Sequence, residues 1–269
     1  MPLDSPYLAT PGKKFRMSDV KTDDTGHFKD KEEAAAEVKK NLKKLAAMQE
    51  LLYAEAKHAV LIVLQAMDTG GKDGAISHVF SGVNPQGCSV TSFKVPTELE
   101  KAHDFLWRIH SAVPRRGMIG IFNRSHYESV LVERVHNLVP KRVWRARYDQ
   151  INGFEAMLAD EGVTILKFFL HISKDEQKRR LQARLDDREK HWKFSVNDLK
   201  ERQFWDDYQE AYEDAIGKCS TKAAPWFVVP ADHKWYRNWV LSDTIVRALH
   251  KLHMEYPKAA PGLDKVVIK

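Results

Sequence analysis

The chain has 269 residues, and its 43 Lys and Arg against 37 Asp and Glu give a net charge of +6. This length is sufficient for one large α/β domain with a substantial buried core. The mild basic excess is compatible with a polyanionic ligand, although many enzymes share it. The only two cysteines, Cys88 and Cys219, form no CxxC pair, which argues against a disulfide framework and against a zinc site.

The N-terminus lacks the apolar core of a secretory signal, and the chain contains no apolar run of the roughly 18 residues that a membrane helix needs. These observations argue against a secreted or membrane-spanning protein. We therefore expect a cytoplasmic protein in a reducing compartment, with no membrane partner.

Residues 1–30 are polar and contain several Pro and Gly residues, which predicts an extended N-terminal arm that lies across the domain or pairs with a neighbouring subunit. Short apolar strands and helices then alternate, so residues 31–269 are expected to form a single α/β domain with a doubly wound parallel sheet. The strands are predicted at residues 59–65, 89–95, 118–122, 163–171 and 226–229. The helices are predicted at residues 31–57, from residue 72 onward, at 98–112, up to residue 134, and at 147–161, 174–189, 197–217 and 233–253.

A glycine-rich loop follows the first strand and reads DTGGKDG over residues 68–74. Glycines allow backbone N–H groups to turn inward around an anion, and a helix that starts near Lys72 directs the positive end of its dipole at the same place. The glycines concerned are Gly70, Gly71 and Gly74. The alternative is a tight turn with an ordinary helix cap, but the strand before and the helix after favour phosphate binding.

The loop resembles a Walker A sequence but departs from it twice. Ala66 stands where the first glycine is expected, and Asp73 stands where Ser or Thr is expected. A carboxylate cannot hold phosphate, but it can hold Mg²⁺ directly or through water. Asp68 adds a second carboxylate to the loop.

The third predicted strand ends in Asn123 and Arg124, and Glu128 follows one turn later. Ligands gather at the carboxyl ends of parallel strands, so we expect these side chains to face the glycine-rich loop. Asn123 occupies the position at which a Walker B strand carries Asp, and an amide oxygen is a weaker metal ligand. Taken alone, Asn123 and Arg124 are slightly better explained as a helix cap followed by a surface arginine.

Residues 174–194 are rich in cations and are predicted to form a lid. Arg180, Arg184 and Arg188 share one helical face at spacings of four, so the helix can close over phosphates and neutralise charge in the transition state. The alternative is a solvated amphipathic helix with several ion pairs. On the next helix, Trp205, Tyr208 and Tyr212 have the spacing of core residues and are interpreted as packing residues.

Three strings, AMDTGGKDG, FNRSHYE and RLDDREKHWKF, together resemble the polyphosphate kinase 2 family, and the resemblance runs through roughly residues 30–255. It implies a P-loop kinase core similar to thymidylate kinase, with a helical lid. It also implies phosphoryl transfer between inorganic polyphosphate and a nucleotide, with Mg²⁺ or Mn²⁺ as cofactor. Asn123 followed by His-Tyr-Glu resembles the subgroup that accepts both AMP and ADP, with Glu128 as the subgroup-specific residue.

The resemblance implies roles for individual residues of this chain. The expected catalytic residues are Asp68, Lys72, Arg124 and Arg180. The expected metal ligands are Asp68, Asp73 and Glu128. The expected substrate-binding residues are Gly70, Gly71, Lys72, Gly74, Asn123, Arg124, Glu128, Arg184, Asp187 and Lys190.

The first hypothesis is therefore a polyphosphate:nucleotide phosphotransferase that acts on AMP and ADP, reversibly, and yields ADP and ATP. The second is an ATP-dependent nucleoside monophosphate kinase, which differs in its phosphoryl donor. The third is a non-catalytic polyanion-binding protein; no recognisable nucleic-acid-binding motif supports nucleic acid as its ligand. The arm and the long helix 31–57 favour a homodimer or homotetramer.

Overall fold

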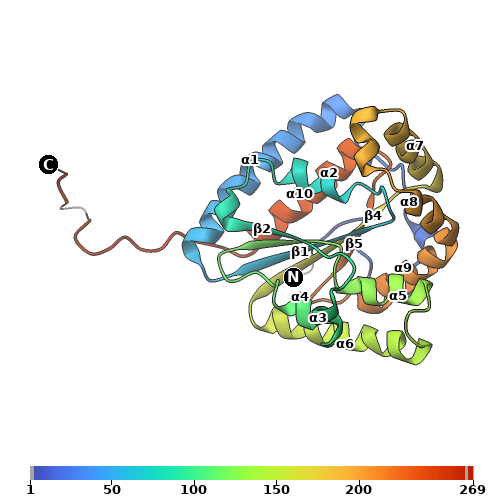
Figure 1. The fold of residues 1–269 in the computed structure, drawn as a ribbon. Helices are drawn as coiled ribbons and strands as arrows, with labels where there is room; N and C mark the ends of the chain where they lie inside the picture. Colours follow the sequence, from blue (N-terminus) through green and yellow to red (C-terminus); the bar gives the residue numbers. More distant parts are fainter. Residues whose placement is uncertain (1–2, 264–265, 269) are drawn as a thin grey trace.

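The computed structural model describes residues 3–263 and 266–268. Its centre is a five-stranded sheet in the order β2-β3-β1-β4-β5, and every pairing is parallel (Figure 1). The strands are β1 Ala59–Ala66, β2 Cys88–Ser92, β3 Ile119–Asn123, β4 Val163–His171 and β5 Trp226–Pro230. The predicted α/β class and parallel sheet are thus confirmed, and β4 has the bounds that its apolar run predicted.

The central strand β1 is buried along its whole length because it lies between β3 and β4 and is covered on both faces. A strand in that position reads as a continuous apolar run, which explains why the sequence identified it. β1 and β3 end side by side, with Leu64 opposite Asn123 in the register. The loops after these two strands therefore emerge at the same edge of the sheet.

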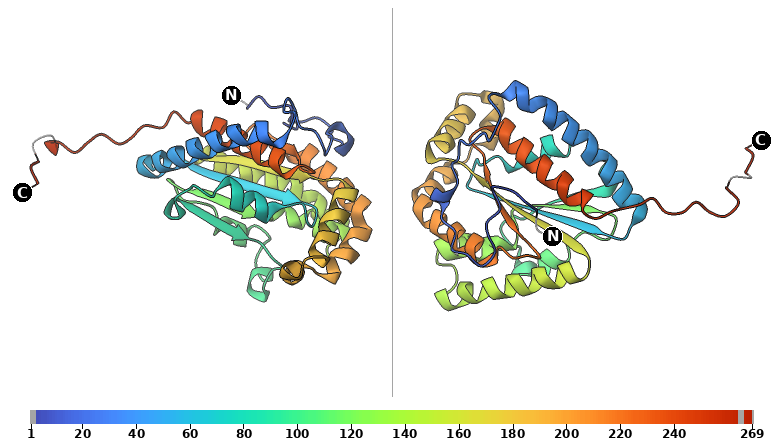
Figure 2. Two further views of the ribbon diagram at one scale, coloured as in Figure 1. Left: turned by 90° about the horizontal axis from the view of Figure 1, so that it is seen from above. Right: turned by 180° about the vertical axis from the view of Figure 1, so that it is seen from behind.

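Helices cover both faces of the sheet (Figure 2). The long helices α1 and α10 lie side by side on one face, with α2 beside α10, and α6 covers the other face. The bounds of the longer helices are α1 Lys31–Glu55, α2 Lys72–Val79, α6 Lys141–Asp160, α7 Lys174–Leu185, α9 Trp205–Cys219 and α10 Lys234–His250. The short ones are α3 Glu98–Lys101, α4 Trp107–His110, α5 Val132–Val135 and α8 Val196–Glu201, with 3₁₀ turns η1 Met17–Asp19, η2 Pro85–Gly87, η3 His126–Ser129, η4 Arg188–Lys193 and η5 Arg202–Phe204.

Several predicted helices are shorter or broken in the structure. The helix expected at residues 98–112 is two single turns, because the Asp104 side chain accepts a hydrogen bond from the Leu106 N–H at 2.9 Å and starts a new turn. The helix expected up to residue 134 is replaced by η3 and α5, and α6 begins six residues before the predicted 147. The helix expected at 174–189 ends earlier, because α7 ends at Leu185. The helix expected at 197–217 is broken into shorter elements, and α9 begins only at Trp205.

The N-terminal segment lies across its own domain, which is one of the two arrangements expected for it (Figure 2). Leu8 forms an antiparallel bridge with Phe227 of β5, and Met17 N–H donates to Glu213 of α9 at 2.7 Å. Tyr7 and Phe28 are buried in the common core. The segment therefore covers the β5 edge of the sheet instead of leaving that edge unpaired.

Candidate active site

The loop after β1 has a backbone that only glycine tolerates at two positions. At Gly70 a side-chain Cβ would lie 2.4 Å from the Cβ of Ala66, and Gly71 has a φ of +96°. Gly70 N–H donates to the carbonyl of Met67 at 2.9 Å, which closes the turn. The N–H groups of residues 71–74, at the start of α2, have no hydrogen-bond acceptor among the described residues. This loop therefore presents free donors at a helix N-terminus, as the sequence predicted for a phosphate site.

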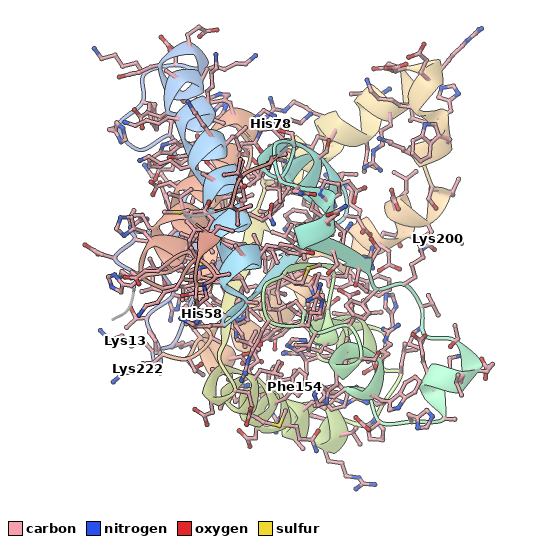
Figure 3. All side chains as sticks on the ribbon, turned by 90° about the vertical axis from the view of Figure 1, so that its left-hand side faces the viewer. Lys13, His58, His78, Phe154, Lys200 and Lys222 are labelled. Carbon is pink, nitrogen blue, oxygen red and sulfur yellow. The ribbon has the colours of Figure 1, made fainter. Side chains whose placement is uncertain are left out.

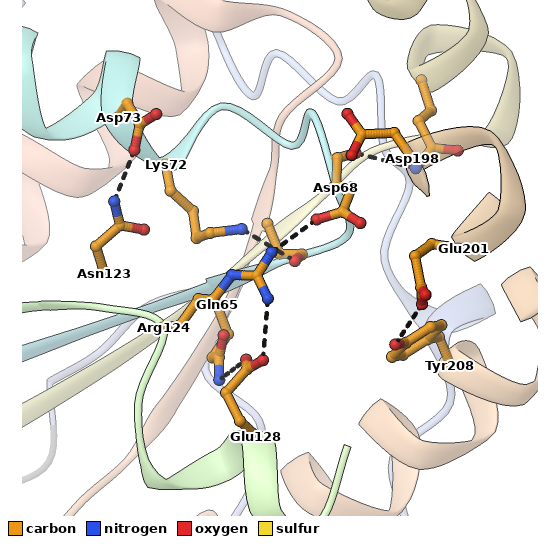
Figure 4. Close-up of polar contacts among 12 residues, drawn as sticks. Gln65, Asp68, Lys72, Asp73, Asn123, Arg124, Glu128, Asp198, Glu201 and Tyr208 are labelled. Carbon is orange, nitrogen blue, oxygen red and sulfur yellow. Dashed lines mark hydrogen bonds and ion pairs between the residues drawn. The ribbon is translucent and has the colours of Figure 1, made fainter. Parts of the chain in front are cut away.

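Lys72 extends from the first position of α2 across the mouth of this loop (Figure 4). Its Nζ donates to the carbonyl of Ala66 at 3.2 Å. Burial lowers the pKa of Lys72 below its usual value, Arg124 lowers it further, and the nearby carboxylates of Asp68, Glu128 and Asp73 oppose the shift. The ammonium group is thus held in a site where an additional negative charge is favourable.

Arg124 joins two of the three predicted metal ligands (Figure 4). Its guanidinium donates to Asp68 at 3.0 Å and to Glu128 at 3.2 Å. The backbone of Arg124 has a φ of 62°, which is uncommon for residues other than glycine. Its backbone N–H donates to the carbonyl of Leu64 at 3.1 Å. Glu128 and Asp68 both raise the pKa of Arg124, so the guanidinium stays charged.

Asn123 and Asp73 form the second contact between the two strand ends. The side-chain amide of Asn123 donates to the Asp73 carboxylate at 2.6 Å. The carboxylate of Glu128 also accepts a hydrogen bond from Gln65 Nε2 at 3.1 Å. The sequence analysis missed Gln65, although a single polar residue inside the apolar run of β1 was a usable signal.

No group of three or more His, Cys, Asp or Glu side chains that could hold a metal ion occurs within residues 3–263 and 266–268. A magnesium ion does not require such a group, because it is commonly bound by one or two carboxylates together with substrate phosphates and water. Asp73 and Asp68 offer hard oxygen donors on either side of the phosphate-type loop, and Asn123 orients Asp73. The donor set therefore fits a magnesium-type ion. Glu128 fits less well as a ligand here, because its two oxygens accept from Arg124 and Gln65.

The three lid arginines, Arg180, Arg184 and Arg188, lie in three different environments and do not form the single basic face that their spacing predicted. Arg180 is buried, and its guanidinium bonds to Glu176 at 2.6 Å and to four backbone carbonyls. Arg184 donates to Asp198 at 3.3 Å, and Arg188 lies beyond the end of α7. The prediction that three arginines share one helical face is therefore wrong for Arg188, which lies on η4, and Arg180 on α7 is buried.

The remaining lid residues, Asp187 and Lys190, pair with each other at 2.5 Å on η4. The hydrogen bond that Lys190 donates lowers the pKa of Asp187. Figure 3 shows Lys200, on α8 after the lid segment, on the opposite side of the molecule from Lys222. Gly74 is exposed on α2, and no neighbour would prevent a side chain there.

A cavity of about 550 Å³ lies between the loop after β1 and the segment that carries α8 and α9, and Gln177 of α7 also lines it. It is lined by Asp68, Arg124 and Glu128 on one side and by Asp198, Glu201 and Tyr208 on the other (Figure 4). The hydroxyl of Tyr208 donates to Glu201 at 2.8 Å. The interpretation of the aromatic stripe as packing thus holds for Trp205, which is buried, but Tyr208 and Tyr212 also line this cavity.

Beneath η3 lies a buried polar network that the sequence analysis did not find. Lys167 of β4 is fully buried and donates to Glu155 at 2.5 Å, to the Tyr127 hydroxyl at 2.8 Å and to the Cys219 carbonyl at 2.7 Å. Glu155 also accepts from Tyr127 and contacts His126 Nε2, each at 3.0 Å. His126 and Tyr127 belong to η3, the turn that carries Glu128, so the network fixes that turn to the sheet and α6.

The parallel α/β fold, the glycine loop with Lys72 and the polar residues that end β3 define a phosphotransferase of the P-loop kinase type. The chain belongs to the polyphosphate kinase 2 family, whose model, described as "Polyphosphate kinase 2 (PPK2)", matches residues 28–257. Members of this family are polyphosphate kinases, and such phosphotransferases need a divalent metal.

Individual relatives agree with this assignment over nearly the whole chain. A protein of Meiothermus ruber named AMP/ADP-polyphosphate phosphotransferase is 57% identical over 264 residues, which cover 98% of this chain and 99% of the relative. An ADP-polyphosphate phosphotransferase of Rhodopseudomonas palustris is 44% identical, with 96% of each chain covered. The crystal structure of polyphosphate kinase 2 from Arthrobacter aurescens TC1 has a TM-score of 0.90 and 46% identity, and covers 94% of this chain and 93% of its own. The predicted family and kinase-type core are therefore confirmed.

No helix in the described part of the chain combines the length and the apolar character that crossing a membrane requires. The cytoplasmic location and the homo-oligomeric state stay predictions.

Proposed function

We propose that the protein transfers the terminal phosphoryl group of inorganic polyphosphate to AMP and to ADP, giving ADP and ATP, and that Mg²⁺ or Mn²⁺ assists the transfer. The single observation that carries the proposal is the convergence of Lys72, Arg124 and the free N–H groups of residues 71–74 at one edge of the sheet. The family match and the AMP/ADP name of the Meiothermus ruber relative support the choice of donor and acceptors.

The acceptor would occupy the cavity between the loop and helices α8 and α9. A volume of about 550 Å³ falls within the range of small-molecule sites and is sufficient for a nucleotide. Arg124 is the arginine among the residues that line this cavity, so it would meet an acceptor phosphate bound there. Tyr208 and Tyr212 supply aromatic surface on the opposite wall, where a nucleoside would lie.

The reaction joins a terminal phosphate oxygen of AMP or ADP to the terminal phosphorus of polyphosphate, and the bond from that phosphorus to the chain's bridging oxygen breaks. The attacking oxygen is already anionic, so no general base is needed. Lys72 and the N–H groups at the start of α2 stabilise the negative charge on the transferred group, and Arg124 orients the acceptor phosphate. A divalent metal held by Asp68 and Asp73 would neutralise charge shared between donor and acceptor phosphates.

Glu128 is the residue that we connect with the acceptance of AMP. Its carboxylate accepts hydrogen bonds from Arg124 and from Gln65, so it sets the position of the guanidinium that meets the acceptor phosphate. AMP has one phosphate fewer than ADP and reaches less far toward the donor. A guanidinium held in one place by Glu128 compensates for that shorter reach.

An assay of donors separates this function from an ATP-dependent nucleoside monophosphate kinase. AMP and Mg²⁺ are incubated with either polyphosphate or ATP, and nucleotides are separated by ion-exchange chromatography. The proposal expects ADP and then ATP with polyphosphate as sole donor. Formation of ADP from AMP with ATP alone, and none with polyphosphate, would establish the alternative instead. Tight polyphosphate binding with no transfer would support the non-catalytic reading.

A further inference from the structure

Two arginines from distant parts of the chain hold the outer side of the phosphate-type loop. Arg180 of α7 donates through Nη1 to the carbonyls of Thr69 at 3.2 Å and Gly70 at 3.0 Å. Arg237 of α10 donates through Nη1 to the carbonyl of Gly71 at 3.1 Å. Three successive carbonyls of the loop therefore accept hydrogen bonds from these two guanidinium groups, which we call the guanidinium pair.

The guanidinium pair is packed directly against Gly71. A Cβ atom at this residue would lie 2.4 Å from Arg237 Nη1 and 3.3 Å from Arg180 Nη1. The glycine thus serves two needs at once, because it allows a φ of +96° and leaves space for both arginines. Both side chains are also buried, with 8% of Arg180 and 3% of Arg237 exposed.

The charges of the two arginines are balanced differently. Arg180 forms an ion pair with Glu176 at 2.6 Å. Arg237 has no carboxylate within ion-pair distance among the described residues, and its other partner is the neutral side chain of Asn238 at 2.7 Å. Burial lowers the pKa of Arg237 to about 10, and the charge of Arg180 adds to the effect. A buried cation without an anion costs free energy, which a bound polyanion would recover.

The geometry of the peptide unit connects these contacts to the site. In a planar trans peptide the carbonyl and the following N–H point in opposite directions. Because the carbonyls of Gly70 and Gly71 point to the guanidinium pair, the N–H groups of Gly71 and Lys72 point away from it. Those N–H groups are among the free donors at the start of α2.

We infer that Arg180 and Arg237 are positioning residues, which turn the N–H groups of the loop toward the polyphosphate donor. Arg237 also places its uncompensated positive charge on the side of the loop opposite those N–H groups. This inference rests on the proposed function and deepens it. It also reassigns Arg180, which the sequence analysis expected to touch substrate. Arg180 thereby joins the lid helix α7 to the loop.

The test replaces Arg237 with methionine, which fills a similar volume without charge. Arg247→Met is the matched control, because Arg247 lies on the same helix and pairs at the surface with Asp243 at 2.8 Å. We expect kcat with polyphosphate to fall about 100-fold in Arg237→Met, the size of effect seen when one preorganised donor is lost. The melting temperature without ligand is expected to stay unchanged or to rise, since a costly buried charge is removed. The rise in melting temperature caused by tripolyphosphate should shrink.

If Arg237 only stabilised the fold, the result would be the opposite. Arg237→Met would then have a lower melting temperature and a normal kcat for each folded molecule. Arg237→Lys provides a second variant that retains the charge but not the planar fork, and it should keep the tripolyphosphate effect while losing about tenfold in kcat. A wild-type kcat in either variant overturns the inference. If the wild-type protein shows no transfer from polyphosphate, the proposed function fails. The inference is then still tested by the rise in melting temperature that tripolyphosphate causes in Arg237→Met and in Arg247→Met. Equal rises in the two variants overturn it.

Discussion

The side-chain amide of Asn123 donates a hydrogen bond of 2.6 Å to the carboxylate of Asp73, and this contact joins the end of β3 to the second residue of α2. The pair stands where a P-loop kinase has Asp and Ser or Thr, so the usual chemistry is exchanged between the two positions. In this chain the carboxylate, Asp73, lies at the loop, and the neutral residue, Asn123, lies at the end of the strand.

The first prediction follows from this exchange. Asp73→Asn, and likewise Asp68→Asn, should raise the Mg²⁺ concentration needed for half-maximal activity by about tenfold or more, because carboxylates provide the hard ligands of this loop. Asp160→Asn, at the exposed C-terminal end of α6, is the control. The measurement is the initial rate of ATP formation as Mg²⁺ is titrated. A parental Mg²⁺ dependence and rate in both loop variants would mean that the metal is held elsewhere.

The second prediction concerns pH. Burial lowers the pKa of Lys72 below its usual 10.5, and the lysine must be protonated to stabilise phosphate. In the free enzyme, activity should therefore decline with rising pH before 10.5 is reached, as an alkaline limb in kcat/KM for polyphosphate. Bound phosphate favours the protonated form, so the limb should be weaker in kcat. Lys72→Arg should shift the limb toward higher pH, since a guanidinium keeps its proton to higher pH than an ammonium group does. A kcat/KM profile that is flat beyond 10.5 would contradict this account.

The third prediction concerns the choice of acceptor. Glu128→Asn removes the charge that holds Arg124 at 3.2 Å, so AMP, with its shorter reach, should lose far more than ADP. We expect kcat/KM to fall about 10- to 100-fold for AMP and only a few-fold for ADP, in line with the loss of one positioned ion pair. If Glu128 only stabilised the first turn of η3, both acceptors would lose the same small amount. An unchanged AMP to ADP ratio therefore rules out the acceptor role.

The fourth prediction concerns the buried network under η3. Lys167→Met leaves the Glu155 carboxylate buried without its cation, which should lower the free energy of unfolding by about 3–5 kcal/mol. Adding Glu155→Gln removes the stranded charge and should restore part of this loss. Urea denaturation of both variants measures the two values. A loss below about 1 kcal/mol for Lys167→Met would mean that the pair contributes little.

The parts of the fold that the sequence predicted well are those in which local pattern and burial agree. β4 was predicted with its observed bounds because most of its nine residues are apolar and the strand is buried nearly throughout. The helix expected at 98–112 was wrong because the side chain of Asp104 begins a new turn, which periodicity does not detect.

The candidate site could be predicted where its residues end a strand or lie in the loop and first helical turn after one, as Asn123, Asp68 and Lys72 do. Arg237 could not be predicted, because its role depends on the packing of α10 against a loop that is far away in the sequence, with a separation of 166 residues. Arg180 shows the same limit: periodicity identifies which residues share a helical face, but not whether that face is exposed. Its partner Ala231 comes from the segment after β5.

The central claim is that one site phosphorylates both AMP and ADP from polyphosphate. The most direct measurement is a time course with AMP, Mg²⁺ and polyphosphate, in which nucleotides are separated by chromatography and compared with Lys72→Ala. The account predicts that ADP forms without a lag and ATP after a lag. Lys72→Ala should abolish both products while its circular dichroism stays that of the folded protein. Accumulation of ADP without any ATP, or near-normal activity in folded Lys72→Ala, would contradict the account.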